Sequence, residues 1–195
     1  MSSSASPRLV VVFGLIASGK TTLAQSLGGR LGWPTIHSDR VRKALAGIPA
    51  TQRVIVPFGE GLYEPAMSGR TYEEMFRQAR AHLQAGTSVI LDGSFMRALD
   101  RQRARELARA CGADVFFILC TCAEAETRRR LAHRAANRQA VSDGRADILR
   151  HQQKLFEPIT DLQDAPVLVV ATDRPPEDIL AEVVAFLDRP RAVSE

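Results

Sequence analysis

The chain has 195 residues and a formal net charge of +4, and 45% of its residues are hydrophobic and 25% charged. These values are typical of one globular α/β domain. No run approaches the ~20 apolar residues of a membrane-spanning helix, so we expect a cytoplasmic protein without a membrane partner. The cysteines agree with this, because Cys120 and Cys122 lack the spacing of a zinc site or of a redox C-x-x-C pair.

Short apolar runs alternate with longer helical stretches along the chain, which favours βαβ units and a parallel sheet. The pattern predicts strands at residues 8–13, 34–37, 87–92, 114–120 and 166–171. It predicts helices at residues 20–31, 39–46, 72–85, 98–111, 123–138, 143–156 and 176–188. We expect one domain over residues 8–188, preceded by a disordered Ser-rich segment (1–7) and followed by a C-terminal tail (189–195).

The first strand is followed by Gly14-Leu15-Ile16-Ala17-Ser18-Gly19-Lys20-Thr21, which matches the phosphate-binding loop pattern G-x-x-x-x-G-K-[ST]. A strand, this loop and a helix in that order let backbone N–H groups and the helix N-terminus converge on one anionic group. In such a loop Lys20 reaches the β- and γ-phosphates, and the Thr21 hydroxyl is a ligand of Mg²⁺. The sequence therefore predicts a nucleoside triphosphate site; the alternative is a glycine turn with a solvated Lys20.

A carboxylate lies at or just beyond the end of each of the next two predicted strands. Asp39 comes after the second strand, at the edge where open α/β sheets bind ligands. There it can orient and deprotonate a hydroxyl acceptor near the γ-phosphate, or serve as the N-cap of the helix that follows. Asp92 ends an apolar run in the form of a Walker B segment. It can hold Mg²⁺ through water or contact the acceptor; the alternative is a simple Asp-Gly turn.

Between these two carboxylates, residues 47–70 are rich in Gly and Pro and include Phe58, Tyr63 and Met67. A long irregular segment in a compact domain is usually functional or disordered. Its aromatic and Met content favours a partly ordered binding loop. The motif Thr71-Tyr72-Glu73-Glu74 has the form of a capping box, so it predicts the start of the next helix.

Arginines gather in two of the predicted helices. Arg130, Arg134 and Arg138 recur every four residues and share one helical face. Such a row can stack on adenine and neutralise the moving phosphoryl group, and the polar stretch behind it is typical of a mobile lid; the alternative is a solvated basic face. Acidic residues interleave the other row, which we expect to be solvated: Arg97, Arg101, Arg103, Arg105 and Arg109. The four histidines lack metal-ligand spacing, so we expect them to be structural or exposed.

Four features together resemble those of the P-loop small-molecule kinases. They are the loop at residues 14–21, Ser38-Asp39-x-x-Arg42, Leu91-Asp92-Gly93-Ser94-Phe95, and the helical face with Arg130, Arg134 and Arg138. This group includes chloramphenicol phosphotransferase, gluconate kinase, polynucleotide kinase domains and the zeta toxins. The chain is most similar to a bacterial kinase-like module described as an AAA domain. The resemblance implies an α/β fold of the P-loop NTPase class. It implies a five-stranded parallel sheet in the order 2-3-1-4-5, with helices on both faces and a helical lid.

The resemblance also implies roles for individual residues. Asp39 corresponds to the catalytic aspartate, and Arg42 to a residue that holds the acceptor or a phosphate. Arg130 corresponds to an arginine that packs on adenine, and Arg134 to one that touches phosphate, while residues 172–175 close over the adenine ring. The predicted set is catalytic Lys20, Asp39 and Arg134; nucleotide-binding Gly14, Ala17, Ser18, Gly19, Lys20, Thr21, Thr22 and Arg130; substrate-binding Arg42, Asp92 and Arg138; and magnesium-binding Thr21, with Asp92 acting through water.

The predicted function is transfer of the γ-phosphoryl group of ATP, with Mg²⁺ as cofactor, to a hydroxyl of a small molecule. Two alternatives are a nucleotide-dependent ATPase that switches a partner and a kinase of nucleic-acid 5′-hydroxyls. The chain lacks the interleaved aromatic residues that stack on single-stranded bases, so we do not expect a nucleic-acid partner.

Overall fold

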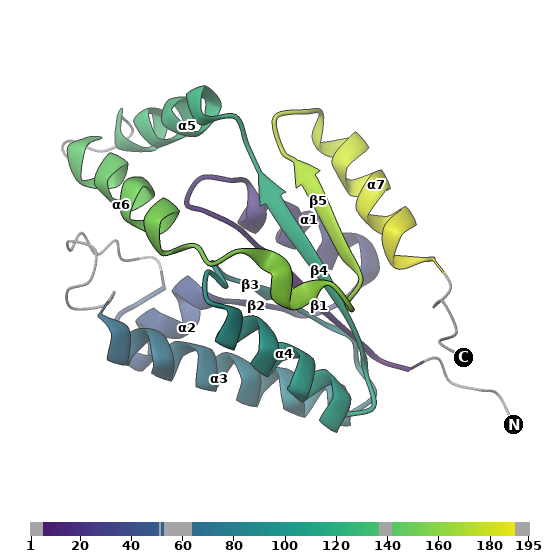
Figure 1. Ribbon diagram of the computed structural model, residues 1–195. Coiled ribbons are helices and arrows are strands. Elements are labelled where there is room, and N and C mark those ends of the chain that lie inside the picture. Colours follow the sequence, from purple (N-terminus) through teal and green to yellow (C-terminus); the bar gives the residue numbers. More distant parts are fainter. Residues whose placement is uncertain (1–5, 51, 53–63, 137–141, 190–195) are drawn as a thin grey trace, which may run out of the picture.

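The computed structural model describes residues 6–50, 52, 64–136 and 142–189. Five parallel strands form one sheet in the order β2-β3-β1-β4-β5 (Figure 1). Their bounds are β1 (Arg8–Phe13), β2 (Thr35–His37), β3 (Val89–Asp92), β4 (Asp114–Thr121) and β5 (Val167–Ala171). The predicted fold class, strand order and parallel direction are confirmed. Most of the predicted lead-in and tail lies outside the described residues.

The helices are α1 (Lys20–Leu31), α2 (Ser38–Leu45), α3 (Pro65–Gln84), α4 (Ala98–Ala110), α5 (Glu124–Ala136), α6 (Ser142–Leu155) and α7 (Pro176–Leu187), with a short 3₁₀ helix η2 (Ile159–Leu162) after α6. Six of the seven predicted helices agree with these bounds to within two residues at each end. Within the described residues, no helix is long and apolar enough to cross a membrane.

The start of α3 differs from the prediction. The helix begins with Pro65 in its first turn, because proline has the backbone angle that a helix start needs and gives up an N–H that has no partner there. Thr71 therefore lies inside the helix and donates its hydroxyl to the Met67 carbonyl at 2.8 Å, so the predicted capping box is wrong. The irregular segment is shorter than predicted, since residues 65–70 are helical, and its residues 51 and 53–63 lie outside the described residues.

Both faces of the sheet are covered by helices, which is why β1 is apolar along most of its length. Val10 and Val12 face a core shared with α1 and α7. Leu9, Val11 and Phe13 point to the opposite face and pack in a core with residues of α2, α3, α4 and η2. A parallel sheet that is buried on both sides leaves its carboxyl edge as the place where polar side chains meet a ligand.

One expectation about α4 is wrong. Arg101 was expected on a solvated face, but it is completely buried. The segment that follows α6 crosses over the start of α4 and covers it. There the Arg101 guanidinium donates to the carbonyls of Phe95 (2.9 Å) and Pro158 (2.8 Å) and pairs with the carboxylate of Asp161 (2.6 Å).

Candidate nucleotide and phosphoryl-transfer site

The loop between β1 and α1 includes residues with positive φ angles, which its small side chains allow. Ala17 and Gly19 have positive φ angles of 60° and 84°. A Cβ at Gly14 would lie 2.4 Å from the Cys120 carbonyl oxygen, and a Cβ at Gly19 would lie 2.9 Å from Thr172 Oγ1. Both glycines are therefore required by close approach as well as by conformation. Left-handed residues within such a turn aim successive N–H groups into one concavity, which suits an anion.

The first turn of α1 supplies the charged and hydroxyl groups of the loop. Gly19 is the N-cap and offers no side chain, and the first turn of α1 contains no acidic residue, so its N–H groups and positive dipole remain available to a phosphate. Lys20 Nζ lies 3.1 Å from the Leu15 carbonyl oxygen, so the lysine folds back across the loop. Thr21 and Thr22 are exposed beside it. These residues fit the triphosphate of a nucleotide and, through Thr21, a hard divalent cation.

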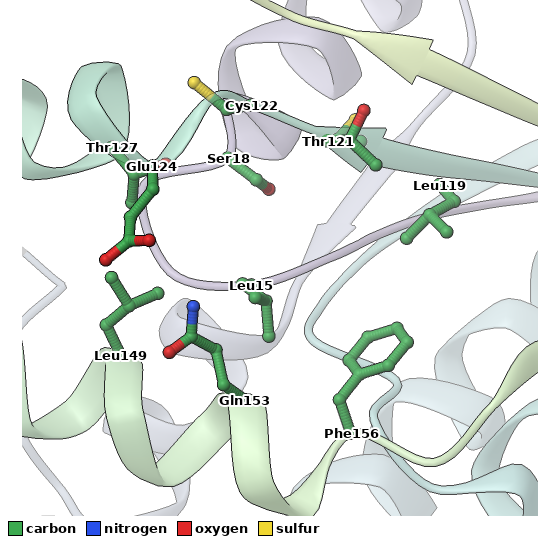
Figure 2. A pocket seen from close by; sticks show the side chains of 11 residues that line it. Leu15, Ser18, Leu119, Thr121, Cys122, Glu124, Thr127, Leu149, Gln153 and Phe156 are labelled. Atoms are coloured by element: carbon green, nitrogen blue, oxygen red, sulfur yellow. The ribbon is translucent and has the colours of Figure 1, made fainter.

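A cavity of about 360 Å³ lies between the loop, the end of β4 and helix α6 (Figure 2). Its wall is mainly apolar, with Leu15, Leu149 and Phe156 among the lining residues. The Ser18 hydroxyl on this wall is buried and has no hydrogen-bond partner in the part of the chain that the structure describes. Cys120 also lines it, and burial raises the pKa of this thiol to about 12, so the thiol stays protonated and unreactive.

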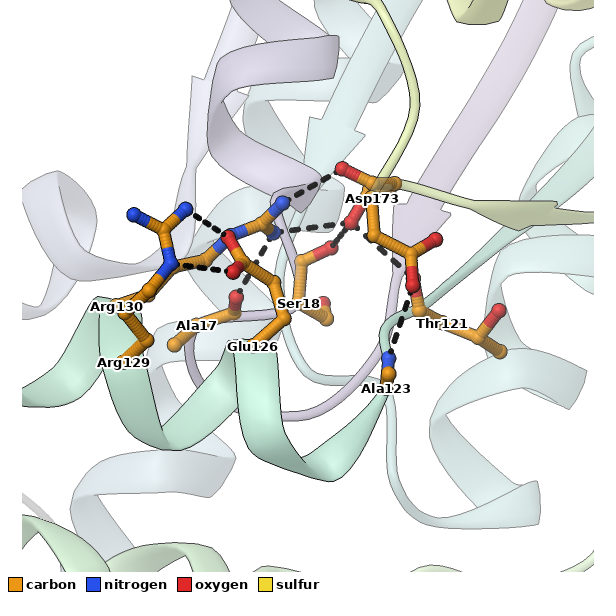
Figure 3. Close-up of polar contacts among 9 residues, drawn as sticks. Ala17, Ser18, Thr121, Ala123, Glu126, Arg129, Arg130 and Asp173 are labelled. Carbon is orange, nitrogen blue, oxygen red and sulfur yellow. Dashed lines mark hydrogen bonds and ion pairs between the residues drawn. The ribbon is translucent and has the colours of Figure 1, made fainter.

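Arg130 joins helix α5 to the loop and to the turn after β5 (Figure 3). Its guanidinium donates to the carbonyls of Thr172 (2.6 Å) and Ala17 (3.3 Å). The Thr172 hydroxyl donates in turn to the Ser18 carbonyl (2.7 Å). A cavity of about 210 Å³ opens beside these contacts and is lined by Gly19, Thr22, Leu23, Ser26, Arg130, Thr172, Arg174, Pro176 and Ile179. The predicted adenine-binding residues Arg130 and Thr172 thus share one hollow next to the loop.

Of the other arginines in this region, the structure describes the side chains of Arg128 and Arg129. Arg128 and Arg129 are exposed and pair with Glu124 and Glu126 on the same helix, as expected for a solvated face. Arg134 belongs to α5, but its side chain is outside the described part of the structure, and Arg138 lies outside the described residues altogether.

The two predicted carboxylates differ in their surroundings. Asp39 is half-exposed in the first turn of α2 and pairs with Lys43 Nζ at 2.9 Å. His37, not Asp39, is the N-cap of α2, so the capping alternative for Asp39 is wrong. Asp92 ends β3, opposite Val12 of β1, and is buried, so it is not a simple turn residue. Arg42 is partly buried on α2, one turn beyond Asp39.

His37 is a neighbour of Asp92 that the sequence analysis did not assign to the site. Its Nδ1 atom lies 2.8 Å from Asp92 Oδ2, and both side chains are buried. They are the last residues of adjacent parallel strands and stand opposite each other in the register. This pairing was readable in principle, because polar residues at the carboxyl ends of neighbouring strands meet at one edge.

Comparison with known proteins assigns the chain to a family. The model of the family described as "AAA domain" matches residues 9–159. An uncharacterized protein of Mycobacterium tuberculosis is 32% identical over 144 residues, which are 74% of this chain but 28% of that protein. The chain therefore spans less than a third of the length of these curated relatives. A gluconokinase of Gluconobacter oxydans is 26% identical over 184 residues, with 91% of this chain and 90% of that protein covered.

Solved structures support the same fold. A sugar kinase from a Janibacter species superposes with a TM-score of 0.66 at 22% identity, and the match covers 97% of this chain and 99% of that one. The order of the five parallel strands and the helices on both faces are those of the P-loop kinases. The chain belongs to the AAA domain family and has the fold of the P-loop small-molecule kinases.

Proposed function

We propose that this protein is an ATP-dependent phosphotransferase that moves the γ-phosphoryl group to a hydroxyl of a small molecule. The observation that carries the proposal is the shared sheet edge. The phosphate loop follows β1, Asp39 follows β2, and Asp92 is the last residue of β3, so all three lie at the carboxyl ends of neighbouring strands. A phosphate site and carboxylates side by side are what phosphoryl transfer to an alcohol requires. The names of the relatives, a gluconokinase and a sugar kinase, support an acceptor that carries hydroxyl groups.

In this proposal the loop N–H groups and Lys20 bind the β- and γ-phosphates. Arg130 and the turn at Thr172 hold the base, and Arg134 neutralises negative charge near the moving phosphoryl group. Mg²⁺, when bound, screens the phosphate oxygens; Thr21 and, through water, Asp92 are the residues that would hold it. The residues on this edge fit that cation, because Asp92 Oδ1 is buried and has no protein partner within the described residues.

The acceptor lies in this proposal on the side of β2 and β3. Asp39 takes the proton of its hydroxyl, because this carboxylate is half-exposed and reachable from solvent. Arg42, one turn further along α2, and Arg138 bind the acceptor. The 360 Å³ cavity is not assigned to it, since Asp39, Arg42 and Asp92 do not line that cavity.

The test is a screen for acceptor-dependent release of ADP. The purified protein is incubated with MgATP and single compounds from a panel of polyols, sugar acids, aminoglycosides and other hydroxylated metabolites. A 5′-hydroxyl oligonucleotide is one member of the panel, and Lys20→Ala is the control for contaminating kinases. We expect one hydroxylated small molecule to raise ADP release far above the basal rate, with a phosphorylated product found by mass spectrometry. ATP hydrolysis that no compound stimulates would contradict the proposal and favour a nucleotide switch.

A further inference from the structure

In the pair formed by His37 and Asp92, one oxygen of the Asp92 carboxylate has a hydrogen-bond partner and the other has none among the described residues. His37 Nδ1 engages Asp92 Oδ2 at 2.8 Å. The second carboxylate oxygen, Oδ1, is buried and has no hydrogen-bond partner among the described residues. A buried carboxylate oxygen that accepts no hydrogen bond is costly, and native proteins avoid it unless a ligand or water completes the site.

Asp92, which carries this unpaired oxygen, lies near the start of the phosphate loop. β3 lies directly beside β1, and the Gly93 N–H donates to the Val12 carbonyl at 3.3 Å. Asp92 is therefore fixed next to Val12, two residues before the phosphate loop begins at Gly14.

The histidine fixes the direction of this carboxylate. An aspartate side chain at a strand end can rotate, and its two oxygens can exchange places. A hydrogen bond from the ring of His37, which is itself only 7% exposed, removes that freedom and fixes the position of Oδ2. Partners of this kind orient metal-binding carboxylates and contribute strongly to metal affinity.

We propose that His37 is a positioning residue that holds the Asp92 carboxylate so that Oδ1 faces the hydrated Mg²⁺ of the bound nucleotide. This inference rests on the proposed function only in that a magnesium nucleotide is the ligand. It needs no assumption about the acceptor. His37 acts through Asp92 and does not itself touch the nucleotide.

A matched pair of amide substitutions tests this role. In His37→Asn the side-chain N–H₂ occupies nearly the place of Nδ1 and can still donate to Asp92 Oδ2. In His37→Gln the same amide lies one carbon farther out, near the place of Nε2, where it does not reach that oxygen. The two variants have the same chemistry and nearly the size of histidine, so they differ mainly in the position of the donor.

The measurement is the binding of ADP by calorimetry, with and without Mg²⁺, and the Mg²⁺ concentration that gives half of the enhancement. We expect His37→Gln to raise that concentration about 10- to 100-fold, whereas His37→Asn stays near the wild-type value. ADP binding without Mg²⁺ should be unchanged in both. A His37→Gln variant with the wild-type Mg²⁺ dependence would overturn the inference. Equal losses of ADP affinity with and without Mg²⁺ would also overturn it, because they would show a purely structural role.

A further variant covers the case in which His37→Gln does not fold. Asp92→Asn keeps an oxygen that accepts from His37 but loses the charge that attracts the cation, so it should lose the Mg²⁺ enhancement and keep ADP binding. An unchanged enhancement would overturn the inference. The two proposals fail separately. A wild-type protein that binds MgADP but phosphorylates no acceptor refutes the proposed function alone, and one whose ADP affinity ignores Mg²⁺ refutes this inference.

Discussion

The guanidinium of Arg101 and the carboxylate of Asp161 are 2.6 Å apart, and together they join two segments that border the candidate site. Arg101 also donates to Phe95 and Met96, which follow the strand end at Asp92. Asp161 lies in the segment that returns from α6. The pair therefore joins the segment that follows β3 to the segment that follows α6. Breaking such a buried pair leaves an uncompensated charge, which is strongly destabilising.

We expect Arg101→Lys to lower the free energy of unfolding by about 3 kcal/mol, because lysine keeps the charge but cannot bond six acceptor oxygens from one planar group. Arg109→Lys is the matched control on the same helix, at an exposed position, and should change stability by less than about 0.5 kcal/mol. Urea unfolding followed by circular dichroism measures both. Equal effects of the two substitutions would contradict the structural role assigned to Arg101.

The phosphate loop predicts a thermal shift with MgATP. At 100 times its dissociation constant a ligand adds about 2.7 kcal/mol, which corresponds to roughly 5–10 °C for a chain of this size. Lys20→Ala should remove most of this shift without unfolding the protein. Lys154→Ala, at an exposed position near the end of α6, should keep it. A wild-type protein that shows no shift with any nucleoside triphosphate would refute the nucleotide site.

Much of the fold was predictable from the sequence because β1, β3 and β4 contain buried apolar runs and most helices have a clear start and end. The phosphate loop was predictable for a similar reason, since its spacing and its place between strand and helix are both local. The start of α3 was not, because Pro65 competes with a good capping box at Thr71 and only the packing of the chain decides between them. Burial of Arg101 depends on a segment some 60 residues away, which a helical periodicity cannot reveal.

In the candidate site too, features set by the local sequence were predictable, whereas contacts between distant segments were not. Asp39 and Asp92 could be selected from the sequence because they lie at the carboxyl ends of two predicted strands. His37 was missed because its partner is 55 residues away in sequence, and their contact follows only from the order of the strands and their register. The link from Arg130 to Thr172 likewise joins residues 42 apart.

Arg130 and Arg128 offer a second matched comparison, because both lie on α5 and both pair with a glutamate of that helix. We expect Arg130→Gln to weaken ATP binding about tenfold, since the Arg130 guanidinium lines the cavity of about 210 Å³ that is proposed to hold adenine. Binding of inorganic tripolyphosphate, which has no base, should change little. Arg128→Gln should leave both affinities unchanged. Calorimetric titration with the two ligands provides the measurement, and a loss shared equally by ATP and tripolyphosphate would contradict a role at the base.

The lowered pKa of Glu126 predicts that the stability of the folded protein depends on pH. Hydrogen bonds from Arg129 and Arg130 lower the pKa of this carboxyl to about 2 from the ordinary value of 4.5. Because the folded-state pKa is depressed, the stabilisation is present at neutral pH and is lost as the pH falls from 4.5 towards 2. Glu126→Gln should therefore melt at a lower temperature than wild type at neutral pH, and the difference should shrink on acidification. A difference in melting temperature that is constant over this range would contradict the assignment.

Asp39 is the residue that separates a kinase from a nucleotide binder. If Asp39 accepts the proton of the acceptor hydroxyl, Asp39→Asn should reduce acceptor phosphorylation on the order of 10²-fold or more and leave ATP affinity nearly unchanged. The substitution also breaks the ion pair between Asp39, whose side chain is 56% exposed, and Lys43, whose side chain is 12% exposed. Lys43→Gln is therefore the matched control, because it breaks the same ion pair but keeps the carboxylate. Steady-state rates with the acceptor from the screen should fall for Asp39→Asn and remain for Lys43→Gln. A fully active Asp39→Asn enzyme would refute the assignment, and Asp92, whose Oδ1 has no partner among the described residues, would then be the base to test.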